Sequence, residues 1–332
     1  MALTLVEAAK RSNNVLQVGI IEKFVYQDPI LQRLGFTDIR GNGLTYNVES
    51  TMSTANFYGV GDDWNESTSV VTPTTAVTTI LGGDADVDNF LKATRSDVND
   101  LMSDEIDAKT KAMKKAFMEM FYYGYYYAGA GADAKGFDGL SYLIRSQAAT
   151  ATSYDNTVCV ATISATAAAL SLEKLEKAVD YVKMGAPEMI LMSKAMRREI
   201  NQYLMGIGGI SKTEHEGKTV QTLFDVPVVV SDYISDKESC TKDYGDGTYG
   251  IDYTLGTALS TNNSATSIFV LSFGPKAVQG IQSLPITVVP IGPLEGKDAD
   301  RVRIKWYPGL MLQNIVTVSK VSGIAPSTTV TA

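Results

Sequence analysis

The longest helical pattern in the chain begins near Asp97 and continues for roughly thirty residues. Acidic side chains crowd its first half and lysines its second half, an order that the helix dipole favours. A helix of that length spans about 45 Å, which is more than a compact domain needs. We therefore predict a helix over residues 97–127 that braces an extended molecule. Its apolar positions make one stripe: Val98, Leu101, Met102, Ile106, Met113, Phe117, Met120 and Phe121.

A β-prone region precedes this helix. Residues 36–40 and 44–48 predict two strands joined by Gly-Asn-Gly at 41–43, which is a hairpin signal. Residues 69–81 are rich in threonine and valine and are followed by two glycines. The region predicts a long, polar, two-stranded flap. Because an isolated two-stranded ribbon is at best marginally stable in water, we expect the flap to lie on a neighbouring copy of the chain.

The N-terminal segment, residues 4–34, has the spacing of short helical pieces. Asp28 and Pro29 predict the start of one helix, with aspartate as its cap and proline in its first turn. We expect this segment to be an arm that lies on another surface.

After residue 150 the pattern alternates between strands and helices. Serines at 171 and 193 predict two helix starts, the second helix running to about Leu204. Residues 188–192, 226–230 and 268–272 are short apolar runs that predict buried strands, and residues 233–264 are polar and rich in turn formers.

Near the C-terminus, Val302, Ile304 and Trp306 alternate with basic residues. This period of two predicts a strand with one buried face. A Tyr-Pro-Gly sequence at 307–309 predicts a turn, and residues 310–321 a second strand. Together they predict an antiparallel closing pair.

Composition narrows the class of protein. The chain has 332 residues, of which 45% are apolar and 20% charged, as in ordinary folded proteins. No apolar run approaches the ~20 residues that cross a bilayer, and no secretory signal is visible at the N-terminus. With 29 basic and 37 acidic residues the net charge is −8, which argues against wrapping nucleic acid by neutralising phosphates.

Candidate metal and catalytic residues fail on number or spacing. His215 is the single histidine, in a charged segment without a nucleophile, and Cys159 and Cys240 are far apart, so a zinc site is not expected. Residues 84–89 resemble the start of a calcium-binding loop, but Asn89 and Arg95 stand where that loop requires glycine and glutamate. We interpret these acidic residues as capping the long helix.

Three further sequences resemble binding motifs without meeting their requirements. The glycines of residues 129–133 follow a helix, whereas a phosphate-binding loop follows a strand, and the glycines of residues 206–209 are expected in a loop after a helix. The tyrosines of residues 122–127 lack the interleaved basic residues of a base-stacking platform and predict aromatic packing. No catalytic, cofactor-binding or metal residue is predicted, and no cofactor.

The order of elements carries a resemblance: N-terminal arm, β-flap, long helix, Phe137-Asp138-Gly139-Leu140, an alternating β/α region and a closing strand pair. In this order the chain resembles tailed-bacteriophage major capsid proteins, whose Hong Kong 97 fold encapsulins share. The resemblance implies an α+β capsid fold and a structural protein that is not an enzyme. It implies hexamers and pentamers in an icosahedral head around double-stranded DNA, which the protein would contact weakly and without sequence specificity.

The same resemblance implies a division into domains. The N-arm would be residues 1–35, the extended E-loop 36–83, and the P-domain with the spine helix 84–164. The A-domain would be 165–285, and residues 286–332 would return to the P-domain. Implied partners are further copies, with scaffolding, portal and decoration proteins as additional ones and no membrane. Implied locations are the virion and, during synthesis, the host bacterial cytoplasm.

Two departures from the best-known member of the family bear on function. No lysine lies between Arg40 and Lys92, so a covalent lysine–asparagine cross-link from the E-loop is not expected. The chain also starts directly at the arm, from which we expect no fused scaffold domain. Three alternatives remain: an encapsulin-like compartment, an extracellular adhesive or binding protein, and an α/β enzyme, the last disfavoured by the scarcity of histidine.

Overall fold

The structure is a computed structural model, and it describes residues 28–51, 53–95, 101–124, 135–150, 157–159, 167–183, 186–207, 211–215, 218–238, 242–243, 249–250, 265–326 and 330–331. The chain divides into two compact units. Unit 1 comprises Met1–Leu44, Ala76–Leu140 and Phe273–Met311; unit 2 comprises Thr45–Thr75, Ser141–Ser272 and Leu312–Ala332.

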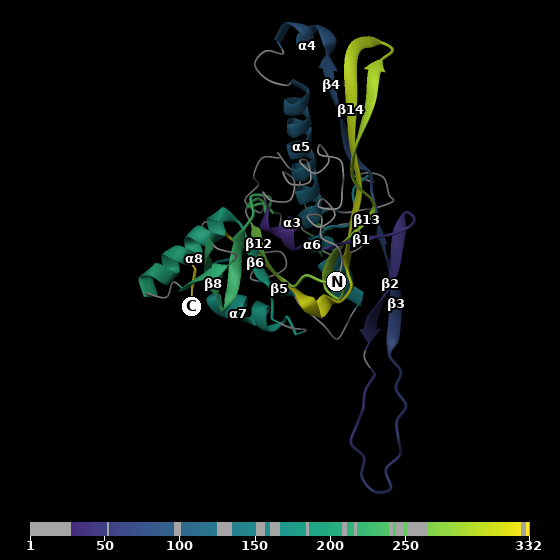
Figure 1. Ribbon diagram of the computed structural model, residues 1–332. Helices are drawn as coiled ribbons and strands as arrows, with labels where there is room; N and C mark the ends of the chain where they lie inside the picture. Colours follow the sequence, from purple (N-terminus) through teal and green to yellow (C-terminus); the bar gives the residue numbers. More distant parts are fainter. Residues whose placement is uncertain are drawn as a thin grey trace. The chain divides into compact units, whose positions relative to one another are not determined.

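Unit 1 is built on a four-stranded sheet in the order β1-β13-β14-β4 (Figure 1). Its two central strands are long and consecutive in sequence. The edge strand β1 runs parallel to β13, and the edge strand β4 runs antiparallel to β14. The bounds are β1 Phe36–Asp38, β4 Leu81–Asp88, β13 Val278–Leu294 and β14 Lys297–Leu312.

Helix α5 (Leu101–Tyr123) packs on this sheet and contributes one apolar face to the core. The ring centroid of Phe117 lies 4.7 Å from that of Trp306 on β14, and Phe36 on β1 lies 5.3 Å from the same tryptophan. All three side chains are fully buried. The indole N–H of Trp306 donates to Gln282 Oε1 at 3.1 Å, so its polar atom is satisfied inside the core.

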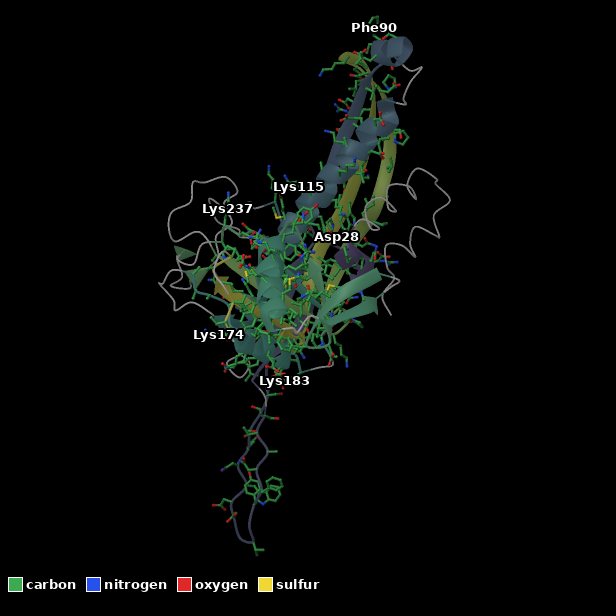
Figure 2. All side chains as sticks on the ribbon, turned by 90° about the vertical axis from the view of Figure 1, so that its left-hand side faces the viewer. Asp28, Phe90, Lys115, Lys174, Lys183 and Lys237 are labelled. Carbon is green, nitrogen blue, oxygen red and sulfur yellow. The ribbon has the colours of Figure 1, made fainter. Side chains whose placement is uncertain are left out.

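Two shorter helices complete unit 1. Helix α3 (Pro29–Arg33) starts as predicted, because the Asp28 carboxylate accepts from the backbone N–H of Ile30 at 3.1 Å. The rest of the predicted arm lies outside the described residues. Helix α4 (Asn89–Arg95) follows β4, and Figure 2 shows Phe90 of this helix at one end of the unit.

The predicted long helix is confirmed over its centre but ends earlier than expected. Gly124 leaves the helix; its N–H donates to the Met120 carbonyl at 2.8 Å, and its own carbonyl accepts from the Gly139 N–H at 2.7 Å. A Cβ on Gly124 would lie 2.5 Å from the Met120 oxygen. The turn at Phe137-Asp138-Gly139-Leu140 therefore packs directly against the helix end, which requires glycine on both sides. Residues 96–100 and 125–127 lie outside the described part.

The predicted hairpin over residues 36–48 is wrong. β1 pairs in parallel with β13, with Phe36 opposite Gly280, while β2 (Gly43–Thr51) pairs with β3 (Val70–Val77) in a separate two-stranded sheet. The Gly-Asn-Gly sequence is thus a change of sheet rather than a hairpin turn. The two-stranded flap itself is present, although β3 ends at Val77 and the glycines after it belong to β4.

The predicted closing pair is also wrong. β14 continues through residues 307–309 without a turn, and β15 (Val318–Ile324) belongs to the sheet of unit 2. The Pro308 carbonyl accepts from the Thr79 N–H at 2.9 Å, and a Cβ on Gly309 would lie 2.6 Å from the Val77 carbonyl oxygen. Gly309 is required for this close approach of two backbones, not for a turn.

Unit 2 contains a seven-stranded sheet in the order β5-β15-β12-β6-β9-β8-β7. The predicted strands at 188–192, 226–230 and 268–272 are confirmed as β6, β9 and β12. The bounds are β5 Thr157–Cys159, β6 Met189–Met192, β7 Ser211–His215, β8 Lys218–Leu223, β9 Val226–Val230 and β12 Thr266–Leu271. The short 3-10 helix η1 (Ile315–Thr317) precedes β15. Strands β10 (Lys242–Asp243) and β11 (Tyr249–Gly250) form a separate pair.

Helices α7 (Leu172–Asp180) and α8 (Lys194–Ile207) cover one face of that sheet (Figure 1). Leu175 of α7 and Met196 of α8 are buried in one cluster with Ile190 and Val270 from the central strands. The Ser193 hydroxyl accepts from the Met196 N–H at 3.3 Å, which confirms the predicted start of α8. Most of the predicted polar loop over 233–264 lies outside the described residues.

Candidate functional site

The two-stranded ribbon of β2 and β3 is anchored at one end within unit 2. Tyr46 and Val48 are buried, and the amide nitrogen of Gln147 on α6 (Leu140–Thr150) donates to the Tyr46 hydroxyl at 3.4 Å. The Thr45 and Thr75 hydroxyls lie 3.1 Å apart across the two strands. The base of the ribbon is therefore held both by apolar burial and by cross-strand contact.

Beyond the paired strands the chain forms an open loop, residues 53–69, which we call the tip loop (Figure 1). Hydrogen bonds cross it: the Thr54 N–H donates to Ser67 Oγ at 2.7 Å, and the Asn65 N–H donates to the Tyr58 hydroxyl at 3.1 Å. The Tyr58 ring is stacked on Trp64, with centroids 4.6 Å apart and planes 18° apart. The tip loop thus has a local conformation without a core of its own.

The apolar side chains of the tip loop face solvent. Relative exposure is 108% for Phe57, 110% for Val60 and 82% for Trp64. Exposed aromatic residues gathered in one place mark contact surfaces, because burying them in a partner is favourable and leaving them in water is not. The tip loop is therefore the strongest candidate for a functional surface in the described chain.

Charge adds a second property to the ribbon. Glu49, Asp62, Asp63 and Glu66 are all exposed, and no lysine or arginine lies between Arg40 and Lys92. Asp62 also orders the loop, because its carboxylate accepts from the Gly59 N–H at 2.6 Å. The surface is both aromatic and acidic, and it would suit a partner that is basic.

Acidic residues on β4 form a second, different arrangement. Asp86 receives two hydrogen bonds from the Arg301 guanidinium, both at 2.6 Å, and Asp84 receives two from Arg303, both at 2.7 Å. Hydrogen bonds from Arg303 hold the pKa of Asp84 below its ordinary value, and those from Arg301 do the same for the pKa of Asp86. Our interpretation of the acidic residues at 84–89 as a cap of the long helix is wrong. Asp84 and Asp86 tie an edge strand to its neighbour, and Asp88 caps the short helix α4, where it accepts from the Phe90 N–H at 2.8 Å.

A buried ion pair joins α3 to α5. Lys114 Nζ lies 3.9 Å from Asp28 Oδ2, with each side chain only about a tenth exposed (10% and 11%). Burial lowers the pKa of Lys114, and the charge of Asp28 opposes that effect. Because the other oxygen of Asp28 caps α3, one carboxylate both starts a helix and neutralises a buried lysine.

The other residues considered from the sequence lie in separate elements or outside the described residues. His215 ends β7 in register with Lys218 of β8, so it lies in a strand of an antiparallel pair. Cys159 lies in β5, and Cys240 lies outside the described residues. Gly206, expected in a loop, lies in the last turn of α8. Tyr122 is buried as expected of packing aromatics, whereas residues 125–134 lie outside the described part.

The described residues contain no group of three or more histidine, cysteine, aspartate or glutamate side chains arranged to hold a metal ion. None of the described helices has both the length and the apolar character needed to cross a bilayer.

The sequence contains one signal for the tip loop and another for the paired aspartates and arginines, and neither is among the predictions above. Phe57, Val60 and Trp64 stand in a polar, glycine-containing segment with no periodicity that could bury them. Aspartates at 84 and 86 and arginines at 301 and 303 each repeat with the period of a strand face. Opposite charges with the same period of two predict adjacent strands.

The family model for the SU10 major capsid protein matches residues 8–236. No match was found among characterised proteins by sequence. By structure, the chain is similar to the SrpI encapsulin of Synechococcus elongatus PCC 7942, with a TM-score of 0.59 and 13% identity over 90% of this chain and 88% of that one.

Two further solved structures show the same likeness. A chain of Mycobacterium phage Ogopogo gives a TM-score of 0.55 at 13% identity, covering 89% of this chain and 91% of that one. The capsid of an empty GTA particle gives 0.53 at 12%, with 89% of each chain covered. At identities this low the structural similarity shows the fold alone. It confirms the α+β, Hong Kong 97-like fold that the order of elements predicted.

Proposed function

The chain belongs to the SU10 major capsid protein family, and from this premise we propose that its copies form hexamers and pentamers of an icosahedral phage head around double-stranded DNA. It is a capsid protein, and we propose that it carries no enzymatic activity. The exposed aromatic tip loop on a ribbon that has no other partner strand among the described residues supports assembly most directly.

The ribbon suits an assembly contact for a physical reason. Among the described residues the two strands are held at their base and pair with no further strand, so both outer edges and the tip loop can contact another copy. A ribbon can then cover a large area of its neighbour without enlarging the core of its own subunit. A repeated contact of one surface with a different surface on the next copy generates closed rings, which are the building blocks of a shell.

The further divisions stay proposals. We propose that residues 1–35 act as the N-arm, 36–83 as the E-loop, 84–164 and 286–332 as the P-domain, and 165–285 as the A-domain. Scaffolding, portal and decoration proteins are proposed as additional partners, with synthesis in the host bacterial cytoplasm. Because the net charge is −8, we propose that packaged DNA is confined rather than bound tightly.

The encapsulin alternative shares the fold but lacks the support of the family model, which describes a phage capsid protein. Neither the family model nor the similar solved structures support an adhesive protein or an α/β enzyme.

The test is electron microscopy of the expressed protein, in parallel with a variant in which a short Gly/Ser turn replaces residues 53–69. We expect the wild type to form shells or rings of six and five copies, alone or with a scaffolding protein. The shortened variant should retain the circular dichroism spectrum of the folded chain and fail to close shells.

A second variant, Phe57→Ser with Val60→Ser and Trp64→Ser, keeps the length of the ribbon and removes its apolar tip. It should also fail to close shells if the tip loop is the contact. A wild-type chain that stays monomeric under all assembly conditions would refute the proposed function, and closed shells from both variants would refute the role of the ribbon.

A further inference from the structure

We propose that Asp28 and Lys114 form an acid-sensitive latch, which holds helix α3 on helix α5 at neutral pH and releases α3 when the Asp28 carboxylate takes up a proton from solvent. We call these two residues the latch. Residues 1–27 precede α3 in the chain, so the latch controls whether the N-terminal segment is attached to its own subunit at α3. The inference does not depend on the proposed function, because it concerns contacts within unit 1.

One carboxylate does two things in this latch. Asp28 Oδ1 accepts from the Ile30 N–H and so begins α3, while Oδ2 faces the Lys114 ammonium group. Both side chains are largely buried, and Figure 1 shows α3 beside α5. Hydrogen bonds to an ionised carboxylate are stronger than those to a neutral group. A proton on Asp28 therefore weakens the cap of α3 and removes the counter-charge of Lys114 in a single step.

The charge on Lys114 depends on Asp28. Burial lowers the pKa of Lys114, and among the described groups Asp28 is the one charge that raises it. The other charged side chain of α3, Arg33, and the charged side chains within one turn of Lys114 on α5, Lys111 and Lys115, are all basic and cannot replace the carboxylate. A buried ammonium group that has lost its partner is strongly destabilising, so the docked position of α3 becomes the costly one.

The release of α3 has a defined limit. The helix has five residues, far fewer than an isolated helix needs to be stable in water, so it depends on docking through Ile30 and Leu31. The next strand, β1, is held separately. The Gly35 carbonyl accepts from the Gly280 N–H at 2.9 Å, and Phe36 is buried in the aromatic core. We therefore expect release to stop at Gly35.

The same helix offers a matched control pair. Lys115 Nζ lies 3.7 Å from Glu119 Oε1, nearly the separation found in the latch, but the side chains are 62% and 27% exposed. The two residues are four positions apart on one helix, so they join no second element. Water screens such a pair, and breaking it changes stability little.

The experiment measures amide hydrogen exchange of the full-length chain by mass spectrometry, comparing residues 30–34 with residues 36–39 as an internal reference. Asp28→Asn removes the charge and keeps the size and the capping ability of the side chain. At pH 7 it should lower the protection of residues 30–34 by at least about tenfold and leave the reference unchanged. The double variant Asp28→Asn/Lys114→Met buries no charge, and its protection should return to within about threefold of wild type.

The control variants are Glu119→Gln and Lys115→Met/Glu119→Gln. Each should change the protection of residues 30–34 by less than about twofold, because the exposed pair does not hold α3. Circular dichroism of every variant checks that the chain is folded. If Asp28→Asn did not fold, the comparison of wild type with the double variant and with Lys114→Met in acid would still decide the inference.

The acid response has a sign that depends on the lysine. In wild type the docked helix needs the charged carboxylate, so its contribution is present above about pH 4, where aspartates ordinarily titrate, and is lost below. After correction for intrinsic exchange rates, the protection of residues 30–34 should fall about fivefold between pH 7 and about pH 3 relative to the reference. In Lys114→Met the buried charge is the carboxylate itself, and a proton removes it, so protection should not fall.

Each outcome decides the inference. Loss in Asp28→Asn, rescue in the double variant and an acid response that requires Lys114 support the latch. Wild-type protection in a folded Asp28→Asn chain, lack of rescue in a folded double variant, or an acid response shared by Lys114→Met would overturn it. Equal losses in residues 30–34 and 36–39 would also overturn it, because the edge of the sheet would then open as a whole. Shell assembly is measured separately, so failure of the latch leaves the proposed function intact.

Discussion

The two tryptophans of this chain lie in opposite environments. Trp306 is fully buried between Phe36 and Phe117 in unit 1, and its indole N–H is hydrogen-bonded to Gln282. Trp64 stands on the tip loop of the ribbon, 82% exposed, with one face on Tyr58. The same residue type thus stabilises the subunit in one place and, in our proposal, contacts another subunit in the other.

The difference comes from what surrounds each strand. β14 has a strand on both sides and a helix over one face, so a large side chain on it finds a core within the chain. Among the described residues no helix and no third strand covers the tip loop, so a large side chain there meets solvent or a partner. Long strands that a helix covers therefore contribute to the core, whereas the uncovered ribbon presents its side chains to solvent or to a partner.

The largest expected effect separates the two tryptophans directly. Trp306→Ala should lower the free energy of unfolding of the unassembled subunit by about 3–5 kcal/mol, because it leaves a cavity in the core. Trp64→Ala should change that free energy by less than about 0.5 kcal/mol, as at other exposed positions. Urea unfolding followed by circular dichroism measures both; equal losses would mean that the tip loop belongs to a core.

A smaller effect tests the tight packing in unit 1. Gly139→Ala should cost about 1–3 kcal/mol, because its Cβ would lie 2.5 Å from the Gly124 nitrogen and close to the Met120 carbonyl. Gly206→Ala in α8 is the control: nothing lies within 4 Å of its Cβ, and the change should raise stability by about 0.4–1 kcal/mol. Effects of the same sign in urea unfolding would contradict this packing.

The smallest effect concerns the carboxylates on β4. Their pKa values in the folded chain lie below the ordinary value of 3.8, so their contribution to stability is present above pH 3.8 and is lost as pH falls through the lowered values. At pH 7 we expect the urea midpoint of the wild type to be higher than that of the double variant Asp84→Asn/Asp86→Asn. That gap should narrow as the pH falls below 3.8 and through the lowered pKa values; a gap that widened in acid would contradict the assignment.

Local pattern predicted those elements that carry their own signals. The stripe of Ile106, Met113 and Phe117 predicted α5, and the cap at Asp28 predicted α3. Short apolar runs predicted β6, β9 and β12. In each case the residues that decide the structure lie within one or two turns of a helix or within one strand.

Pairing across long distances was not predicted. β1 pairs with residues near Gly280, more than two hundred positions away, and no local pattern distinguishes that parallel partner from a hairpin partner eight residues along. Pro308 and Gly309 were predicted to make a turn. They lie instead inside β14, where the backbone near Val77 comes too close for any side chain at 309.

The same difference between local and long-range signals applies to the candidate surfaces. The sequence alone indicated a polar ribbon without lysine that needs a neighbour, and it predicted no metal or catalytic site. It did not distinguish Trp64 from a core tryptophan.

The amino-acid sequence by itself determined the order and kind of the elements, because helix caps, apolar periods and charge patterns act over a few residues. Only the tertiary structure decided which strands pair, where glycines permit two backbones to touch, and which aromatic residues remain in water. Those properties depend on contacts between distant segments, whose free energy no single segment contains.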